Sequence, residues 1–242
     1  MEKRNIVLAY HSVGAHPAGE TGAELYAVPL DRFKEQMEHI KKVLGSRLEV
    51  VGIDVTFDDG DITNYTNAYP ILKEKRLKAS FFIIGSRLGT PGYMGWDEIR
   101  ELRDAGMVIG SHGMTHRILT NLSDEDLSYE LNGSKKILED NLKAGIDTIS
   151  IPRGFYNEKV IDAAKRAGYK KIFTSDNRIV VRPGWDMGHF KKVLNNGYLF
   201  QDKAEDFLKY SLKKILGAKH YDRIRTKFLH PTPYNPQPTT RL

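Results

Sequence analysis

The chain has 242 residues, of which 40% are apolar and 28% charged, a composition that allows one large globular domain with a substantial core. It contains no cysteine, which excludes disulfides and thiolate metal ligands, so any metal ion would have to be held by His, Asp or Glu. The whole net charge of +6 lies in residues 203–242, with nine Lys/Arg against three Asp/Glu, and the neutral remainder is not expected to bind nucleic acid.

Strand-like and helix-like segments alternate from the N-terminus to about residue 176. The strand-like segments are "NIVLAYHSV", "LEVVGIDVTF", "KASFFIIG", "MVIGSH", "DTISIPRG" and "KIFTSD". Helical segments stand between them, including a long helix from about Ser123 to Ala144 that opens on the capping-box-like "SDED". Six or seven such units predict an α/β fold whose parallel sheet, at this length, closes or nearly closes into a barrel.

Three regions are expected along the chain. Residues 1–202 form a single barrel domain, residues 203–230 a basic amphipathic helical segment, and residues 231–242 a proline-rich, disordered tail. No apolar run approaches the ~20 residues of a membrane span, and the N-terminal residues do not resemble a secretory signal. We therefore expect a cytoplasmic protein, unless a leader precedes this sequence. The basic segment either packs on the barrel or contacts an anionic membrane surface.

Titratable or cationic residues follow nearly every predicted strand. In parallel α/β folds, ligands bind at the C-terminal ends of the strands, so these residues are candidates for one common site. They are His11, Asp58, Asp59, His112, His116, Arg153 and Asp176.

The segment "VTFDDG" places two adjacent carboxylates at a strand end. Because side chains alternate along a strand, Asp58 shares a face with Thr56, whereas Asp59 must turn off the strand, and Gly60 permits that turn. Two carboxylates can therefore reach one site with different roles. In the plainer interpretation, Asp59 only satisfies backbone amides in an Asx-turn. An EF-hand calcium loop is disfavoured because "DDGDIT" lacks the glycine of the sixth position.

The segment "SHGMTH" places His112 and His116 four residues apart at the end of another strand. A helical turn there would project both imidazoles to one side, a known metal-binding arrangement, although lone histidines are more often structural. Together with an aspartate from the neighbouring strand, the pair makes a two-histidine, one-carboxylate set. Such a set leaves positions open for water and substrate, as catalytic zinc or ferrous sites require.

Three motifs, "TFDDG", "SHGMTH" and "PRGFYN", in this order and spacing resemble the first three motifs of the polysaccharide deacetylase family, the carbohydrate esterases named for a nodulation-factor deacetylase. The resemblance covers roughly residues 5–190. It implies a distorted (β/α) barrel of about seven strands and one divalent metal ion, usually zinc. It also implies hydrolysis of the N-acetyl group of amino sugars such as N-acetylglucosamine, with release of acetate.

Carried over to this sequence, the resemblance implies that Asp59, His112 and His116 bind the metal ion. Asp58 would be the general base toward the attacking water, and Arg153 would hold Asp58 in place and ionised. Cobalt, nickel and ferrous iron accept the same ligands as zinc.

Two parts of the sequence depart from the family pattern. The third motif has Phe155 where a proline is usual, which would reshape the groove wall beside Tyr156, whose backbone amide would help to stabilise the oxyanion. In place of the fourth motif, Asp176 is the candidate partner of Arg153. Trp185, a candidate sugar platform, stands much further along the chain than the pattern predicts.

The amide leaving group needs a proton from a general acid. His230, in "FLH", fits the usual last-strand motif superficially, but it follows a basic helix and enters the proline-rich tail. His11, in "LAYHSVG", resembles the family branch in which this motif is permuted to the N-terminus, as in deacetylases of biofilm poly-N-acetylglucosamine. The first and last strands of a closed barrel are neighbours, so we assign the acid to His11. A satisfied core histidine is the alternative.

Two other functions stay open at this point. One is a deacylase or deformylase of a small or lipid-linked aminosugar at the cytoplasmic membrane surface. The other is a carbohydrate-binding protein on a fold that has lost catalysis, which the intact Asp58, Asp59, His112, His116 and Arg153 disfavour.

Overall fold

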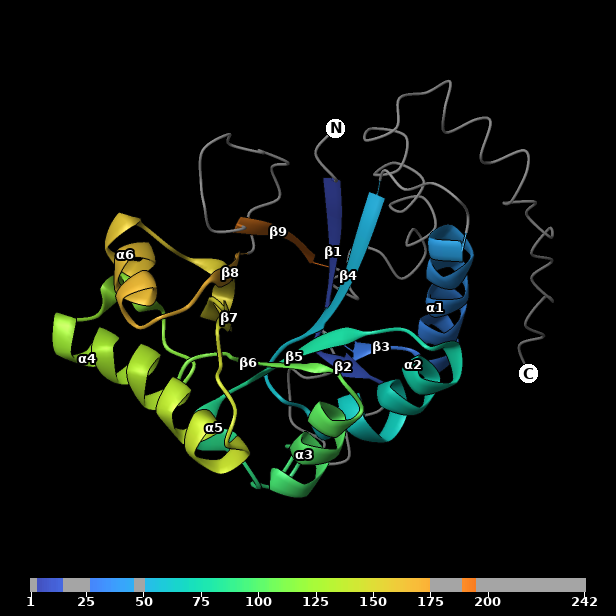
Figure 1. Cartoon of the computed structure of the whole chain (residues 1–242), viewed down its shortest axis with the longest axis horizontal. Helices are drawn as coiled ribbons and strands as arrows, with labels where there is room; N and C mark the ends of the chain where they lie inside the picture. The colour runs from blue at the N-terminus through green and yellow to red at the C-terminus, as the bar shows by residue number, and fades with distance from the viewer. Residues whose placement is uncertain (1–3, 15–26, 46–50, 175–188, 195–242) are drawn as a thin grey trace, which may run out of the picture. The chain divides into compact units, whose positions relative to one another are not determined.

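The computed structural model of the chain describes residues 4–14, 27–45, 51–174 and 189–194. Seven strands form a closed barrel in the order β1–β4–β5–β6–β7–β8–β9, and every neighbouring pair is parallel (Figure 1). The strands are β1 (Arg4–Tyr10), β4 (Val51–Phe57), β5 (Ala79–Ile83), β6 (Val108–Ser111), β7 (Thr148–Ser150), β8 (Lys171–Thr174) and β9 (His189–Leu194). The predicted α/β barrel of about seven parallel strands is thus confirmed.

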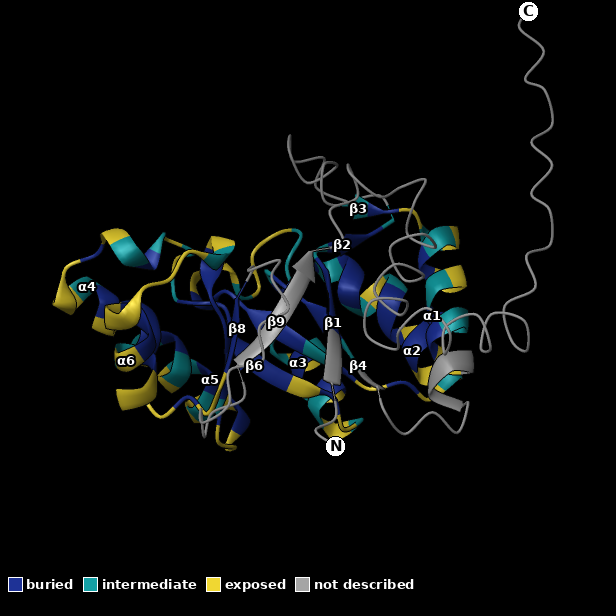
Figure 2. Cartoon of the chain, turned by 90° about the horizontal axis from the view of Figure 1, so that it is seen from above, coloured by how far each residue is buried: buried dark blue, intermediate teal, exposed yellow. Residues whose placement is uncertain are grey.

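Helices follow the strands along the chain and lie outside the barrel (Figure 1). They are α1 (Leu30–Gly45), α2 (Tyr69–Lys75), α3 (Trp96–Asp104), α4 (Asp124–Ser128), α5 (Ser134–Leu142) and α6 (Glu158–Arg166). Figure 2 shows these helices with buried faces toward the strands and exposed faces outward. A short parallel pair, β2 (Ser12–Val13) with β3 (Ala27–Val28), was not predicted.

The long helix predicted from Ser123 is broken by a π-helical turn. The hydroxyl of Ser123 caps α4 by accepting from the N–H of Asp126 at 3.1 Å. A π-helical turn, Tyr129–Gly133, then separates α4 from α5, and the helical segment ends at Leu142. Such turns add one residue to a helical turn and shift the side chains that follow.

The two faces of the strands pack differently, and this fixes the direction of the site residues. Val7, Phe82 and Phe173 come from strands that are not neighbours, so they meet inside the barrel, with the two phenyl centroids 5.0 Å apart. On the opposite face, the ring of Phe57 stacks on that of Phe81 at 4.8 Å and contacts Phe33 of α1. Because side chains alternate, the residue after Phe57 points into the barrel end.

Several predicted segments lie outside the described residues. They are the basic segment 203–230, the tail 231–242 and the strand end beyond Thr174, so the predicted division into three regions stays a prediction. Among the helices that the structure describes, none combines the length and the apolar character that crossing a bilayer requires.

Candidate metal and catalytic site

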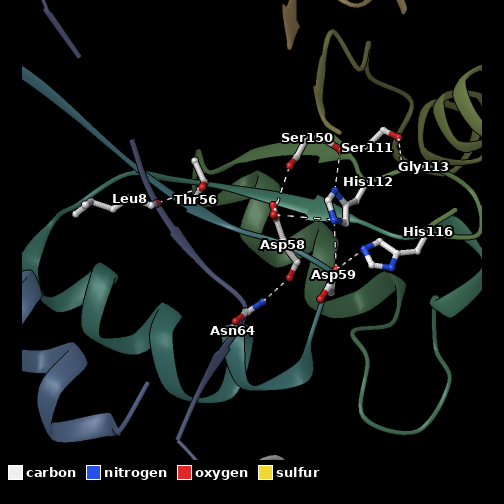
Figure 3. Close-up of polar contacts among 10 residues, drawn as sticks. All are labelled: Leu8, Thr56, Asp58, Asp59, Asn64, Ser111, His112, Gly113, His116 and Ser150. Atoms are coloured by element: carbon white, nitrogen blue, oxygen red, sulfur yellow. Dashed lines mark hydrogen bonds and ion pairs between the residues drawn. The ribbon is translucent and has the colours of Figure 1, made fainter. Parts of the chain in front are cut away.

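Asp59, His112 and His116 converge at the C-terminal ends of β4 and β6 (Figure 3). The Nε2 atoms of His112 and His116 lie 3.3 Å and 3.5 Å from Oδ1 of Asp59. All three potential ligand atoms lie within 4.8 Å of one another, and the two imidazole centroids are 5.0 Å apart. The structure therefore brings together the three residues predicted as metal ligands.

His112 is held in one orientation by its other ring nitrogen. Its side chain is only 2% exposed, and Nδ1 lies 2.7 Å from the backbone carbonyl oxygen of Ser150. Since a carbonyl only accepts, Nδ1 carries the proton and donates it, which leaves the lone pair of Nε2 directed at Asp59. A histidine prepared for metal binding has this arrangement.

Asp59 sits on a turn that leaves the strand in a left-handed conformation. Its φ is 69° and that of Gly60 is 78°, so the chain reverses immediately after β4. Burial raises the pKa of the Asp59 carboxyl, but its polar contact with His112 and its electrostatic interactions with the His11, His112 and His116 rings hold it well below its usual range. Asp59 is therefore an ionised carboxylate facing two imidazoles.

His116 completes the set from a loop. Its φ is 62°, and its side chain is 28% exposed. Burial, with the charges of His112 and Arg153, lowers the pKa of His116 to about 4, against the opposing charges of Asp59 and Asp58. Its imidazole is thus neutral near pH 7, the form that binds metal ions.

One observation that is independent of the sequence motifs indicates that these residues fit a divalent ion. Oδ1 of Asp59 is buried and has no hydrogen-bond partner among the described residues, although two Nε2 atoms face it. A cation between one carboxylate and two imidazoles would satisfy this oxygen. Nitrogen and oxygen donors in this number suit zinc and similar ions and leave coordination positions open.

Asp58 points into the barrel end beside Asp59 and His112, as the strand alternation predicts. Only 3% of the residue is exposed, and its Oδ2 accepts from the Ser150 hydroxyl at 3.4 Å and lies 4.0 Å from Nε2 of His112. Because β7 is not a neighbour of β4 in the barrel, the contact with Ser150 crosses its interior. Asp58 and Asp59 therefore reach the same site from different directions.

His11 lies at the same level as Asp58. The register pairs Tyr10 with Phe57, and the N–H of Asp58 donates to the carbonyl of Tyr10 at 2.9 Å. His11 is half-buried, and its charge acts on Asp59. The first strand thus ends next to the site.

The third motif forms a turn after β7 that carries three of the predicted residues. Arg153 has a φ of 55° and an exposed side chain, and its charge acts on His116. Among the described residues it forms no hydrogen bond or ion pair with Asp58, which instead contacts Ser150. Phe155 and Tyr156 follow with 58% and 40% of their surface exposed. Asp176, Trp185 and His230 lie outside the described residues.

Three polar residues that form hydrogen bonds with the site residues or with their loops were not predicted from the sequence. Ser150 contacts both Asp58 and His112. Asp61 is buried, accepts from the Ser12 hydroxyl at 2.9 Å, and so ties β2 to the loop after β4. Glu130 is fully buried under the loop that carries His116. A signal for Asp61 and Ser12 was present, since they stand four and two residues beyond the ends of β4 and β1, which are neighbours in the barrel.

The chain is similar in sequence to known proteins. The sequence model described as polysaccharide deacetylase matches residues 47–172. A protein named putative polysaccharide deacetylase YxkH, from Bacillus subtilis, is 34% identical over 122 residues, which are 50% of this chain and 44% of that protein. A peptidoglycan-N-acetylglucosamine deacetylase from Bacillus cereus is 33% identical over 162 residues, 64% of this chain and 74% of that protein.

A solved structure shares the fold. It is the Streptococcus pyogenes deacetylase PplD in complex with acetate, with a TM-score of 0.69 and 23% identity over 84% of this chain and 96% of that chain. At this identity the likeness concerns the barrel alone. This chain spans less than half of the length of the Bacillus subtilis relative.

Proposed function

The chain belongs to the polysaccharide deacetylase family, and we propose that it is a metal-dependent hydrolase that removes N-acetyl groups from the amino sugars of a glycan or glycan precursor. The observation that carries the proposal is the convergence of Asp59, His112 and His116, with Nδ1 of His112 already bonded to a backbone carbonyl. The name of the Bacillus cereus relative supports an acetylated amino sugar as the substrate class.

We assign one divalent ion, zinc in the first place, to Asp59, His112 and His116. When bound, such an ion polarises an amide carbonyl and lowers the pKa of water from about 15.7 to about 7. The ionised Asp59 and the neutral His116 are in the protonation states that ligation requires. Cobalt, nickel and ferrous iron accept the same donors, so the native ion has to be measured.

Asp58 is the group that takes a proton from the attacking water. It points into the barrel end beside His112, and the hydroxyl of Ser150 fixes Oδ2 of its carboxylate. A carboxylate can act as a general base when it lies within reach of the water, directly or through one water molecule. Its neighbour Asp59 is directed to the two histidines, so the two carboxylates have separate tasks.

His11 is the group that gives a proton to the leaving amine. It lies beside Asp58 at the end of β1. In the order of the barrel strands, β1 precedes β4 whereas β6, which leads to the loop of His116, follows it, so His11 and this loop stand on opposite sides of Asp58. Expulsion of an amine requires its protonation, and imidazole is the side chain best suited to this near neutral pH.

The substrate is expected to lie along the turn after β7. Phe155 and Tyr156 expose large rings next to Arg153, whose charge reaches His116. Exposed apolar rings beside a polar site mark a binding surface, and they suit the apolar faces of a sugar. The backbone amide of Tyr156 is assigned to the developing oxyanion, a role that a fixed N–H donor performs without reorganisation.

Acetate release tests the proposal directly. The zinc-loaded chain is incubated with N-acetylglucosamine oligomers, peptidoglycan fragments and lipid-linked N-acetylated amino sugars, beside the variant Asp58→Asn. We expect acetate from at least one glycan substrate and a large loss of rate in the variant. No release from any of them, or an unchanged rate in Asp58→Asn, would overturn the assignment. Release from the lipid-linked sugars alone would favour action at a membrane surface.

A further inference from the structure

Glu130 is a carboxylate buried out of contact with solvent, and the catalytic proposal gives it no role. It lies on the π-helical turn between α4 and α5 and is 0% exposed. Its Oε2 accepts the N–H groups of Met114 at 2.8 Å and of Thr115 at 2.9 Å, and its Oε1 accepts the hydroxyl of Thr115. All of its partners belong to the loop between His112 and His116.

The backbone of this loop adopts positive φ values that need support from the surrounding structure. Gly113 has a φ of 76°, and a Cβ atom there would stand 2.9 Å from Oε2 of Glu130. His116 also adopts a positive φ, which non-glycine residues rarely do unless their surroundings impose it. The close approach of Glu130 and the left-handed turn therefore occur together.

Two sets of contacts clamp the loop from opposite sides. The carbonyl oxygens of Gly113 and Met114 accept from the N–H groups of Gly85 at 3.1 Å and Ser86 at 2.8 Å. The amide side of the loop faces Glu130 instead. Removing the carboxylate would leave the N–H groups of the half-buried Met114 and the exposed Thr115 without this acceptor, which would weaken the hold on the loop conformation.

The two histidines depend on this clamp to different degrees. His112 is fixed by the end of β6 and by its own bond to the Ser150 carbonyl. Within the described part of the chain, the ring of His116 has no comparable bond, and its position follows from the loop backbone. Any relaxation of the loop would move Nε2 of His116 away from Asp59 and His112.

We propose that Glu130 is a positioning residue for metal binding, which holds the loop of residues 113–116 so that His116 completes the ligand set. The inference rests on the proposed metal site and adds to it a residue that touches neither metal nor substrate. Partners that orient metal ligands typically contribute about 10–100-fold to metal affinity.

Metal affinity separates this role from a general contribution to folding. The dissociation constant for zinc is measured by competition with a chromophoric chelator, and the visible absorption of the cobalt form reports ligand geometry. We expect Glu130→Ala to bind zinc about 10–100-fold more weakly, with an altered cobalt spectrum. Glu130→Gln should stay within a few-fold of the wild type, because its amide oxygen can accept both N–H groups while the Thr115 hydroxyl turns to accept from its NH₂.

Glu139 supplies a matched control on α5. Its Oε1 also accepts a backbone N–H, that of Ile146 at 2.9 Å, and pairs with Lys135, but it does not contact the loop of His116. Glu139→Ala should lower stability while the zinc affinity and the cobalt spectrum stay unchanged. Equal weakening in Glu139→Ala and Glu130→Ala would overturn the inference.

The remaining outcomes are also distinguishable. Wild-type affinity and an unchanged cobalt spectrum in Glu130→Ala would overturn the role of Glu130 and leave the metal site intact. If Glu130→Ala does not fold, Thr115→Val removes only the hydroxyl donor and should weaken zinc binding several-fold, whereas wild-type affinity there would contradict the inference. A wild-type chain that binds neither zinc nor cobalt would overturn the metal site itself.

Discussion

The strand ends and the loops that follow them supply the site in different ways. Asp58 and His112 come directly after β4 and β6 and are 3% and 2% exposed. Asp59 and His116 stand on the turns beyond, at φ values of 69° and 62°, with side chains 25% and 28% exposed. The first pair is placed by the hydrogen-bonded barrel, whereas the second pair is placed by turns that need support from elsewhere.

Backbone strain in the described residues follows the same division. Among them, five non-glycine residues have a positive φ, and two of these, Arg76 and Lys143, end helices. The other three are Asp59, His116 and Arg153, all at the site. Such conformations cost about 1–3 kcal/mol each and persist where the surroundings impose them. Strain is therefore concentrated in the loops that carry the chemistry.

The largest effect on turnover is expected from Asp58, on the strand side. Asp58→Asn keeps the shape of the side chain but removes the base, so the rate of acetate release should fall by about 10²–10⁴-fold while zinc stays bound. Steady-state rates and zinc content of the same sample test this. A variant that lost its zinc would show that the two adjacent carboxylates do not have separate tasks.

His11→Ala should lower turnover within the same range of about 10²–10⁴-fold, since a general acid contributes about as much as a base. Metal content should not change, because His11 is not among the ligands. His39→Ala, on the outer helix α1, is the control and should keep the wild-type rate. If His11→Ala turned over as fast as the control, His11 would have no part in the reaction.

A smaller effect is expected from the loop side, through Gly113. Gly113→Ala adds a Cβ atom 2.9 Å from Glu130 and 3.1 Å from Pro152 at a φ of 76°. We expect it to lower the free energy of unfolding by about 2 kcal/mol, measured by urea titration, and to weaken zinc binding about tenfold.

Gly89→Ala is the matched control for this substitution. Gly89 has a φ of 68°, but an added Cβ atom meets nothing within 4 Å, so only the backbone strain changes. It should lower stability by about 1 kcal/mol and leave zinc affinity unchanged. Equal losses of affinity in both alanine variants would mean that the contact with Glu130 is unimportant.

The last prediction concerns the acid stability of the metal-free chain and involves no change in turnover. The pKa of His116 falls to about 4 in the folded state, below the 6.5 of an ordinary imidazole. Between these values the unfolded chain binds a proton that the folded chain does not, so His116 makes stability fall as the pH drops from about 6.5 to about 4. The lowered pKa of Asp59 acts only below its ordinary value of 3.8, outside this window.

Urea unfolding in EDTA at pH 7 and pH 4.5 measures this contribution. His116→Asn removes the titrating ring. The free energy of unfolding of this variant should therefore fall less between pH 7 and pH 4.5 than that of the wild type. Equal losses would show that His116 titrates normally in the folded chain.

The barrel and the strand-end residues could be predicted because their causes are local. Alternating strand and helix patterns indicate the parallel barrel, and the period of two places Asp58 on the face opposite Phe57. Parallel strands place their C-terminal ends together, so His11, Asp58 and His112 were expected to meet.

The supports of the site could not be predicted because they depend on distant contacts. Glu130, in "LSYELNG", reads as an exposed helical charge, and only the fold brings it under a loop that precedes it by 15 residues. The π-helical turn that carries Glu130 has no sequence signal that we recognised. Arg153 stands exposed on the turn after β7 and its charge acts on His116, so its predicted role toward Asp58 stays a prediction, whereas the contact of Ser150 with Asp58 was not predicted.

Zinc content per chain tests the central claim most directly. The purified wild-type chain and His112→Ala are loaded with zinc, dialysed and analysed by atomic absorption, with folding checked by circular dichroism. The site described here predicts about one ion per wild-type chain and almost none in the folded variant. A wild-type chain without zinc, or a variant with the full complement, would contradict the assignment of Asp59, His112 and His116 as a metal centre.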